Sequence, residues 1–166
     1  MLPTISLTIV HITVIVAAVL VSTKAGLAIG FVWGLNSLLR AVFTASPFER
    51  LIFQSPLVSI LPRMIMPLLV GSLAAYLYKK EVKTPVLGLV TGLAGSLLNT
   101  ILVLGAIGLF KGAEYASGMA IESDTLWKVL GGLVVANGLP ETVMSAIVTP
   151  LILVALNRFS YRRKQA

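Results

Sequence analysis

The sequence predicts an all-α integral membrane protein, a single domain over residues 1–166 that bundles five transmembrane helices. Hydrophobic residues make up 57% of the 166 residues and charged residues only 11%, whereas soluble domains carry about 25% charged residues. Apolar runs long enough to cross a bilayer, which takes about 20 residues, recur along the chain. Short polar stretches that carry most of the charge separate these runs.

The five predicted spans cover about residues 5–23, 25–43, 57–78, 85–110 and 129–157. The first has no Lys, Arg, Asp or Glu before Lys24, and the fourth has no formal charge. In the fifth, Pro140 removes a backbone donor and is expected to break or kink the helix. Residues 129–137 are therefore expected to form a separate, shallow segment.

Positive charges in the loops predict the orientation, because cytoplasmic loops are enriched in Lys and Arg. One side of the predicted bundle carries eight of them: Lys24, Lys79, Lys80, Lys83, Arg158, Arg162, Arg163 and Lys164. The loops of the other side carry Arg50, Lys111 and Lys128 together with Glu49, Glu114, Glu122 and Asp124. The carboxyl terminus is therefore expected on the cytoplasmic side.

Five spans with the carboxyl terminus inside would place Met1 outside. The first residues, "MLPTIS", have neither the basic region nor the cleavage site of a signal peptide. Two explanations stay open at this point. Either a helix that precedes Met1 is missing from this sequence, or a five-helix chain inserts as written.

Several classes of protein are excluded by residues that the chain lacks. Without cysteine there is no disulfide, thiolate metal site or cysteine nucleophile. His11 is the only histidine, so a zinc site with three or four ligands is not expected, and His11 is interpreted as a packing residue. No catalytic triad, HExxH motif or phosphate loop is present, which predicts a protein that is not an enzyme and needs no cofactor. The net charge of +7 lies between apolar runs, so the lipid bilayer is the expected partner and nucleic acid is not.

Charges inside a span are costly and are usually functional or paired. Arg40 lies near the end of its span, where its side chain can reach the interface. Arg63 lies about seven residues into its span, in "ILPRMIMP". Pro62 removes a backbone donor, and Pro67 cannot bond back to the carbonyl of Arg63. Irregular backbone is tolerated in membranes only where it faces protein or a wet cavity.

Arg63 is therefore expected to line an outward-facing pocket, where a guanidinium suits a carboxylate or phosphate. The alternative is an internal ion pair with Glu141, which lies in "ANGLPETV". Glu141 itself could instead accept hydrogen bonds from substrate hydroxyls.

Three intramembrane amides, Asn36, Asn99 and Asn137, are further candidates, since an amide both donates and accepts. Each could equally be a polar contact between helices. Trp33 fits an interfacial belt of aromatic residues. The candidate substrate-binding residues are Arg63, Asn99, Asn36, Trp33, Asn137 and Glu141, and no metal-binding residue is expected.

Two rows of glycines mark close approaches of helices. Gly26, Gly30 and Gly34 recur at a spacing of four in the second span, and Gly88 and Gly92 do so in the fourth. The favoured interpretation is tight packing within one bundle. The alternative is that one of these faces docks a partner helix.

The stretch "ISLTIVHITVIVAAVLVSTKAGLAIGFVWGLNSLLRA", followed by "SPLVSILPR", resembles the substrate-binding S component of an energy-coupling factor (ECF) vitamin transporter. It is most similar to the pantothenate-type branch, and the resemblance covers nearly the whole chain. It implies a protein of the plasma membrane of a prokaryote. It also implies a fold of six membrane helices with both termini cytoplasmic, of which this sequence would lack the first.

The resemblance further implies a division of labour. The S component would bind a water-soluble vitamin from outside, and a transmembrane coupling subunit with two ATPase subunits would drive its uptake. Arg63 of "LPR" and Asn99 of "SLLNT" carry over as ligand contacts. For pantothenate, Arg63 would neutralise the carboxylate, Asn99 and Asn36 would bind the amide or hydroxyls, and Trp33 would pack on the methyl groups.

Other readings of the sequence stay open. The substrate could be another vitamin or precursor, such as hydroxymethylpyrimidine or riboflavin. A neutral pyrimidine would need aromatic stacking more than Arg63, and only 7% of the chain is aromatic. From another class, a small channel or holin-like protein would need a polar stripe along a whole helix face, whereas the polar residues here cluster near one side of the membrane.

Overall fold

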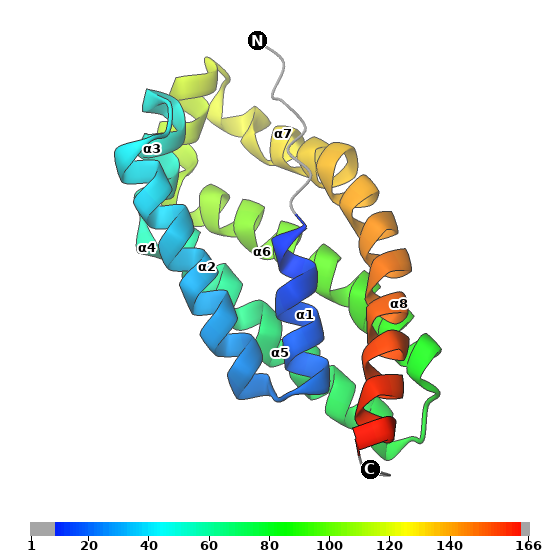
Figure 1. Cartoon of the computed structure of the whole chain (residues 1–166). Coiled ribbons are helices and arrows are strands. Elements are labelled where there is room, and N and C mark those ends of the chain that lie inside the picture. The colour runs from blue at the N-terminus through cyan, green and yellow to red at the C-terminus, as the bar shows by residue number, and fades with distance from the viewer. Residues whose placement is uncertain (1–8, 164–166) are drawn as a thin grey trace.

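The computed structural model describes residues 9–163, with side chains up to Asn157, and every regular element in that part is a helix (Figure 1). In chain order they are α1 (Val10–Leu20), α2 (Thr23–Phe43), α3 (Pro47–Phe53), α4 (Pro56–Ser59), α5 (Leu61–Lys79), α6 (Thr84–Met119), η1 (Ser123–Thr125), α7 (Leu126–Leu133), η2 (Val134–Gly138) and α8 (Leu139–Arg163). The all-α fold predicted from the sequence is confirmed.

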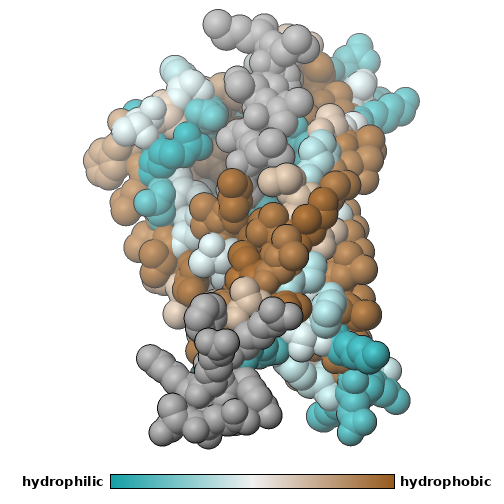
Figure 2. Space-filling view, turned by 45° about the vertical axis from the view of Figure 1, so that its right-hand side comes forward, coloured by the Kyte–Doolittle hydropathy of each residue, from teal (hydrophilic) through white to brown (hydrophobic). Residues whose placement is uncertain are grey.

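Four helical stretches of the described chain are long and apolar enough to cross a membrane: Thr23–Phe43, Pro56–Lys79, Thr84–Met119 and Ser123–Asn157. α1 is a shorter apolar helix of 11 residues. The first predicted span starts at residue 5, and residues 5–8 lie outside the described part. Figure 2 shows apolar side chains over the middle of one face and polar side chains toward its two ends, as expected of a surface that faces lipid.

The connections divide between the two ends of the bundle. The α1–α2 turn, the α5–α6 turn and the end of α8 lie at the lower end in Figure 1, and α3 and α7 lie at the upper end. α1 contacts α2, α5, α6 and α8, so it occupies the centre of the bundle.

Prolines define where several helices begin, because a proline in the first turn sacrifices no helical hydrogen bond. Pro47 starts α3, where Ser46 and Glu49 form a reciprocal capping box. Pro56 starts α4, and α4 ends at Ile60, immediately before α5. The irregular backbone expected around Arg63 is thus an interruption at Ile60, and Arg63 itself lies in the first turn of α5.

α6 changes direction at Lys111, whose φ of −137° and ψ of 19° are not helical. The Lys111 ammonium pairs with the Glu114 carboxylate at 2.9 Å beside this kink. The segment 111–128, a connection outside the predicted spans, is mostly helical. It packs inward, because the Tyr115 ring is buried with its centroid 5.5 Å from that of Phe48.

In the fifth predicted span, α7 and α8 follow one another without a break in the helix, and the chain changes direction between them, with α7 across the upper end of the bundle and α8 running down from it (Figure 1). α7 passes into α8 through a π-helical turn, η2. Pro140 has no N–H for the carbonyl of Ala136 and its ring crowds that carbonyl. The chain accommodates Pro140 by widening one turn, and such π turns commonly lie at functional sites.

The glycine rows pack within the bundle, as favoured from the sequence. A methyl group at Gly34 would lie 2.8 Å from the Cα of Ile60, and one at Gly88 would lie 2.5 Å from the Cα of Pro150 on α8. Backbone therefore meets backbone at both places, which only glycine permits.

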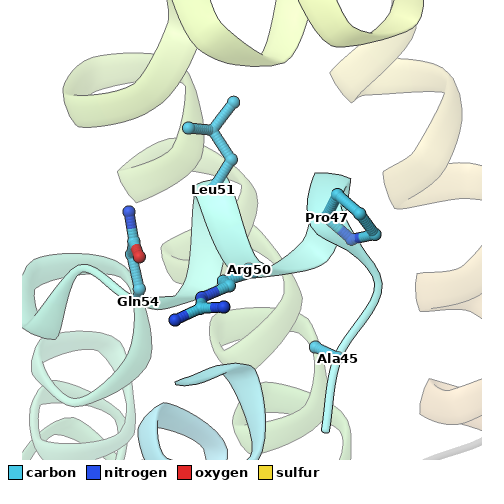
Figure 3. A pocket seen from close by; sticks show the side chains of 5 residues that line it. All are labelled: Ala45, Pro47, Arg50, Leu51 and Gln54. Carbon is cyan, nitrogen blue, oxygen red and sulfur yellow. The ribbon is translucent and has the colours of Figure 1, made fainter. Parts of the chain in front are cut away.

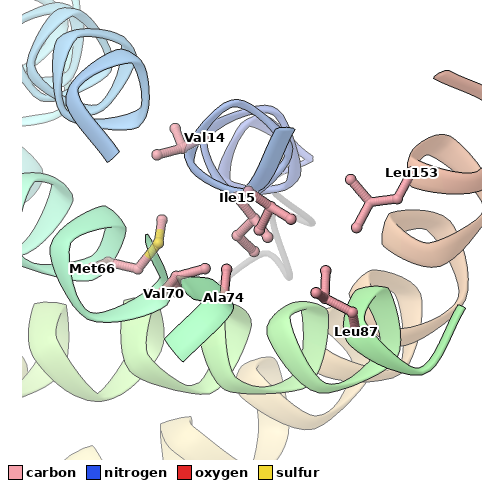
Figure 4. Packing of buried hydrophobic residues seen from close by; sticks show 8 residues of the cluster. Val14, Ile15, Met66, Val70, Ala74, Leu87 and Leu153 are labelled. Atoms are coloured by element: carbon pink, nitrogen blue, oxygen red, sulfur yellow. The ribbon is translucent and has the colours of Figure 1, made fainter. Parts of the chain in front are cut away.

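Buried apolar residues form two clusters at different heights. The lower cluster consists of Val14, Ile15, Val19, Met66, Val70, Ala74, Leu87 and Leu153 (Figure 4). The upper cluster consists of Ile52, Val58, Ala106, Ile107, Tyr115, Leu126 and Leu130. The lower cluster joins α1, α5, α6 and α8, and the upper one joins the short helices α3, α4 and α7 to α6.

Candidate functional site

Buried polar residues lie between the two apolar clusters. On the α4–α5 segment, Val58 belongs to the upper cluster and Met66 to the lower one, and Arg63 lies between them. On α6, Leu87 and Ala106 belong to the lower and upper clusters, and Asn99 lies between them. Arg63 and Asn99 are each only 7% exposed. We call this pair of residues the polar layer.

The Arg63 guanidinium is held by neighbours that leave one edge of it open. Its Nη1 donates to the carbonyl oxygen of Val58 at 2.6 Å. The Trp33 and Phe53 ring centroids lie 5.3 Å and 6.0 Å from its Cζ, within the range of cation–π attraction. Its buried Nε has no hydrogen-bond partner among the described residues. The Nε–H is thus left for a ligand, and an arginine that donates through Nε can bind a carboxylate bidentately.

Arg63 is also not neutralised by an acid in the described part of the chain. The ion pairs there join Arg40 to Glu49 at 4.0 Å and Lys111 to Glu114 at 2.9 Å. The internal pair of Arg63 with Glu141, considered from the sequence, is not formed. A buried charge without a counter-ion costs several kcal/mol, typically about 3–5 when one partner of a pair is missing. Such a residue inside a membrane span is a functional candidate.

The sequence around Arg63 explains how α5 is placed. Pro67 leaves the Arg63 carbonyl without its helical donor, and α2 packs directly on this carbonyl at Gly30. A methyl group at Gly30 would overlap the Arg63 oxygen and would lie 3.4 Å from Cγ of Pro67. Gly30 and Pro67 therefore fix the position of the Arg63 backbone.

Asn99 provides the second open polar group. Its Oδ1 is buried and has no hydrogen-bond partner among the described residues. The hydroxyls nearby are already engaged: Thr100 donates to the Ser96 carbonyl at 3.2 Å, and Thr142 donates to the Ser96 hydroxyl at 3.3 Å. An unmet acceptor in the interior costs about 1–3 kcal/mol, which a ligand donor would recover.

Arg63 and Asn99 lie at similar distances along α5 and α6 from a contact that the two helices share. α5 and α6 run in opposite directions, and a methyl group at Gly95 of α6 would lie 3.2 Å from Cγ2 of Val70 on α5. From this contact Arg63 lies seven residues up α5 and Asn99 four residues up α6. At about 1.5 Å per residue these are distances of about 10 Å and 6 Å along the two helix axes, and they differ by less than one helical turn.

The other candidates are placed differently. Trp33 is half-buried beside Arg63, so its ring packs on the guanidinium. Asn36 is exposed, because it lies about 200° around α2 from Gly34, which faces Ser59 and Ile60 where α4 meets α5. The structure therefore does not bring Asn36 to Arg63 and Asn99. Asn137 is half-buried within η2, and Glu141 is half-buried in the first turn of α8.

Sequence reasoning did not identify Phe53. It lies at the end of α3, where its carbonyl accepts a hydrogen bond from the Ser59 hydroxyl and its ring covers Arg63. A cavity of about 240 Å³ lies on the other side of the same short helix, lined by Ala45, Pro47, Arg50, Leu51 and Gln54 (Figure 3). No residue of the polar layer lines this cavity, so it is distinct from the site around Arg63.

The fold and the site define a multi-pass membrane protein with a buried polar site between two apolar clusters. Comparison with known proteins places it further. Residues 1–153 match the family described as ECF transporter, substrate-specific component. The chain is 31% identical over 164 residues to the pantothenic acid transporter PanT of Lactococcus lactis subsp. cremoris, covering 91% of this chain and 78% of that protein.

A second relative, the pantothenate transporter PanT of Leuconostoc mesenteroides subsp. mesenteroides, is 33% identical over 153 residues. That match covers 89% of this chain and 71% of the relative. The chain belongs to the family of substrate-specific components of ECF transporters. The resemblance stated from the sequence is confirmed, and with it the prediction of a membrane-embedded subunit that recognises a transported substrate for an ECF module.

Proposed function

We propose that this chain captures pantothenate from outside the cell and delivers it to an ATP-driven module of one transmembrane coupling subunit and two ATPases. The observation that carries the choice of substrate is Arg63, a buried guanidinium with no acidic partner in the described chain and with no hydrogen-bond partner for its Nε. Pantothenate offers the missing carboxylate, together with an amide and two hydroxyls. Both named relatives are pantothenate transporters.

Asn99 suits the remaining polar groups of this ligand, because its open Oδ1 can accept from the amide N–H or from a hydroxyl. Trp33 and Phe53 hold the guanidinium in place by cation–π contacts. The chain hydrolyses nothing in this scheme, and its contribution is selective binding.

The orientation that fits this role places the lower end of the bundle in the cytoplasm. That end carries the exposed residues Lys24, Lys79, Lys80 and Lys83, as the positive-inside rule requires. The carboxyl terminus is then cytoplasmic. The upper end, where α3 covers Arg63, faces the medium that contains the vitamin.

The test is equilibrium binding of labelled pantothenate to the purified protein, with unlabelled riboflavin and hydroxymethylpyrimidine as competitors. Arg63→Met keeps a long apolar side chain between the two clusters and should fold, yet it removes two charge-assisted hydrogen bonds of about 1.5–3 kcal/mol each. We expect affinity to fall more than about 100-fold. The matched control is Arg40→Met, which alters an exposed arginine at the same end and should bind like the wild type.

Binding that survives in Arg63→Met within about twofold would remove Arg63 from the site. Displacement of the label by riboflavin or hydroxymethylpyrimidine but not by pantothenate would keep the family and replace the substrate.

A further inference from the structure

A buried serine ties the short helices beside Arg63 together. Ser59 is the last residue of α4, and 0% of its surface is exposed. Its hydroxyl donates to the carbonyl oxygen of Phe53, the last residue of α3. A carbonyl in the last turn of a helix has no donor within its own helix, so the Ser59 side chain supplies the missing partner. The bond therefore attaches the end of α3 to α4 across the turn at residues 54–55.

The backbone of Ser59 is itself held in place from two sides. A methyl group at Gly34 of α2 would lie 2.9 Å from the Ser59 carbonyl oxygen and 2.8 Å from Cα of Ile60. The Ser59 N–H donates to the carbonyl oxygen of Ser55, the residue before α4, at 3.0 Å. Ser59 is thus a fixed point to which the end of α3 is attached.

Two contacts of the Arg63 guanidinium come from the segments that Ser59 joins. The Val58 carbonyl, which accepts from Nη1 at 2.6 Å, belongs to the peptide bond between Val58 and Ser59. The Phe53 ring, whose centroid lies 6.0 Å from Cζ, belongs to the residue whose carbonyl Ser59 binds. Helix ends fray, and α3 has only seven residues. Without the Ser59 bond, the residue that covers Arg63 would be at a helix end that is free to unwind.

We infer that Ser59 is a positioning residue of the binding site, which holds the Phe53 ring against Arg63 and thereby fixes the direction of the guanidinium N–H groups. This inference rests on the function proposed above, and Ser59 acts in it through Phe53 and not on the ligand. Without the ring in place, the guanidinium loses a neighbour that restricts its rotation. Rotation matters because a hydrogen bond weakens steeply as its angle departs from linear.

The alternative role of Ser59 is a cap for α3 and nothing more. A cap bonds to backbone, so its contribution to stability is about the same whatever side chain the capped residue carries. A positioning residue affects ligand affinity, and it does so only while the Phe53 ring is present. The two roles therefore differ in how the effects of changing Ser59 and Phe53 combine.

The test is a double-mutant cycle in which pantothenate affinity is measured for the wild type, Ser59→Ala, Phe53→Leu and the double variant. Ser59→Ala removes only the hydroxyl, and Phe53→Leu removes the ring and keeps an apolar side chain against the upper cluster. We expect Ser59→Ala to bind pantothenate about five- to tenfold more weakly, and Phe53→Leu to lose a similar factor. In the Phe53→Leu background, Ser59→Ala should change the affinity by less than about twofold, because the ring that it positions is gone.

Ser145→Ala is the matched control, because Ser145 is also fully buried and its hydroxyl bonds to that of Thr149 at 3.3 Å within α8. It should bind pantothenate like the wild type, and thermal unfolding of each variant shows whether the fold is kept. Losses that add in the double variant would assign Ser59 a structural role independent of Phe53 and overturn the inference. Wild-type affinity in Ser59→Ala would overturn it as well. If the wild type binds no pantothenate, the proposed function fails, and this role of Ser59 fails with it.

Discussion

Gly30→Ala tests whether the approach of α2 to the Arg63 carbonyl positions the guanidinium. The added methyl group would overlap the Arg63 oxygen and would lie 3.2 Å from the carbonyl carbon and 3.4 Å from Cγ of Pro67. These atoms are backbone or proline ring, which cannot rotate away as a flexible side chain can. Either α2 and α5 separate, or the first turn of α5 shifts and carries Arg63 with it.

The magnitude follows from the cost of overpacking, about 1–3 kcal/mol for one extra carbon in a tight contact. Replacing glycine by alanine also favours a helix by about 1 kcal/mol, and this gain must be cancelled by a control. Gly105→Ala supplies it, because Gly105 lies in the interior of α6 and a methyl group there meets nothing within 4 Å. Relative to Gly105→Ala, we expect pantothenate affinity to fall between about fivefold and 150-fold if the strain is released in the site.

The assay is titration calorimetry of both variants with pantothenate in the same detergent, with thermal unfolding measured beside it. Strain that is released by separating the helices would appear as a lower unfolding temperature, and strain that shifts Arg63 would appear as weaker binding. Equal affinity and equal unfolding temperature in the two variants would refute the reasoning, since the contact would then place no constraint on α5.

Two further outcomes follow from the described contacts. Asn99→Leu should weaken pantothenate binding about tenfold in the same titration. It should not lower the unfolding temperature, because the buried Oδ1 has no partner among the described residues to lose. A large drop in unfolding temperature would instead show a structural role. Gly88→Ala should lower the free energy of unfolding by about 1–3 kcal/mol, since its methyl group would lie 2.5 Å from the Cα of Pro150. Gly131→Ala is the control, because a methyl group there meets nothing within 4 Å. Both variants are unfolded by titration with a denaturing detergent, and equal free energies of unfolding would contradict the expectation.

Arg63 and Asn99 could be selected from the sequence as candidate site residues, because polar side chains are rare within membrane spans. A guanidinium or an amide in an apolar run carries a desolvation penalty that a structural role rarely offsets. Pro67 strengthened the inference for Arg63, because it predicts a carbonyl without its helical donor. These arguments need only the residue and its position along one helix, and the structure places both residues in the interior.

The partners of these residues could not be found in the same way, since they depend on how helices face one another. Phe53 lies on a seven-residue helix that hydropathy does not distinguish from a loop, yet its ring covers Arg63. Asn36 has the same chemistry as Asn99 and lies on the exposed face of α2.

The fold was likewise predictable in part: the apolar helices followed from the sequence, and the packing of the polar segments did not. The length of an apolar run predicts where a helix crosses the membrane. The fourth predicted span ends at residue 110, next to the kink at Lys111. The polar composition of the segment beyond the kink did not predict that part of it is buried, yet Tyr115 and Leu126 belong to the upper cluster. Pro140 was predicted to break or kink the helix. The chain stays helical there because one turn widens into a π-helix, and its direction changes between α7 and α8 (Figure 1).

The two apolar clusters and the polar layer together imply how binding and stability are coupled. The clusters hold the bundle without using Arg63, so the open guanidinium edge and the Asn99 oxygen lower the stability of the empty protein without being needed for its fold. A ligand that supplies a carboxylate and a donor removes both penalties at once, and a ligand bound only by the folded state stabilises it by mass action. Under the proposed function, the same unpaired groups that destabilise the empty protein would be the source of its selectivity, because a ligand without an acid would leave Arg63 buried and unneutralised.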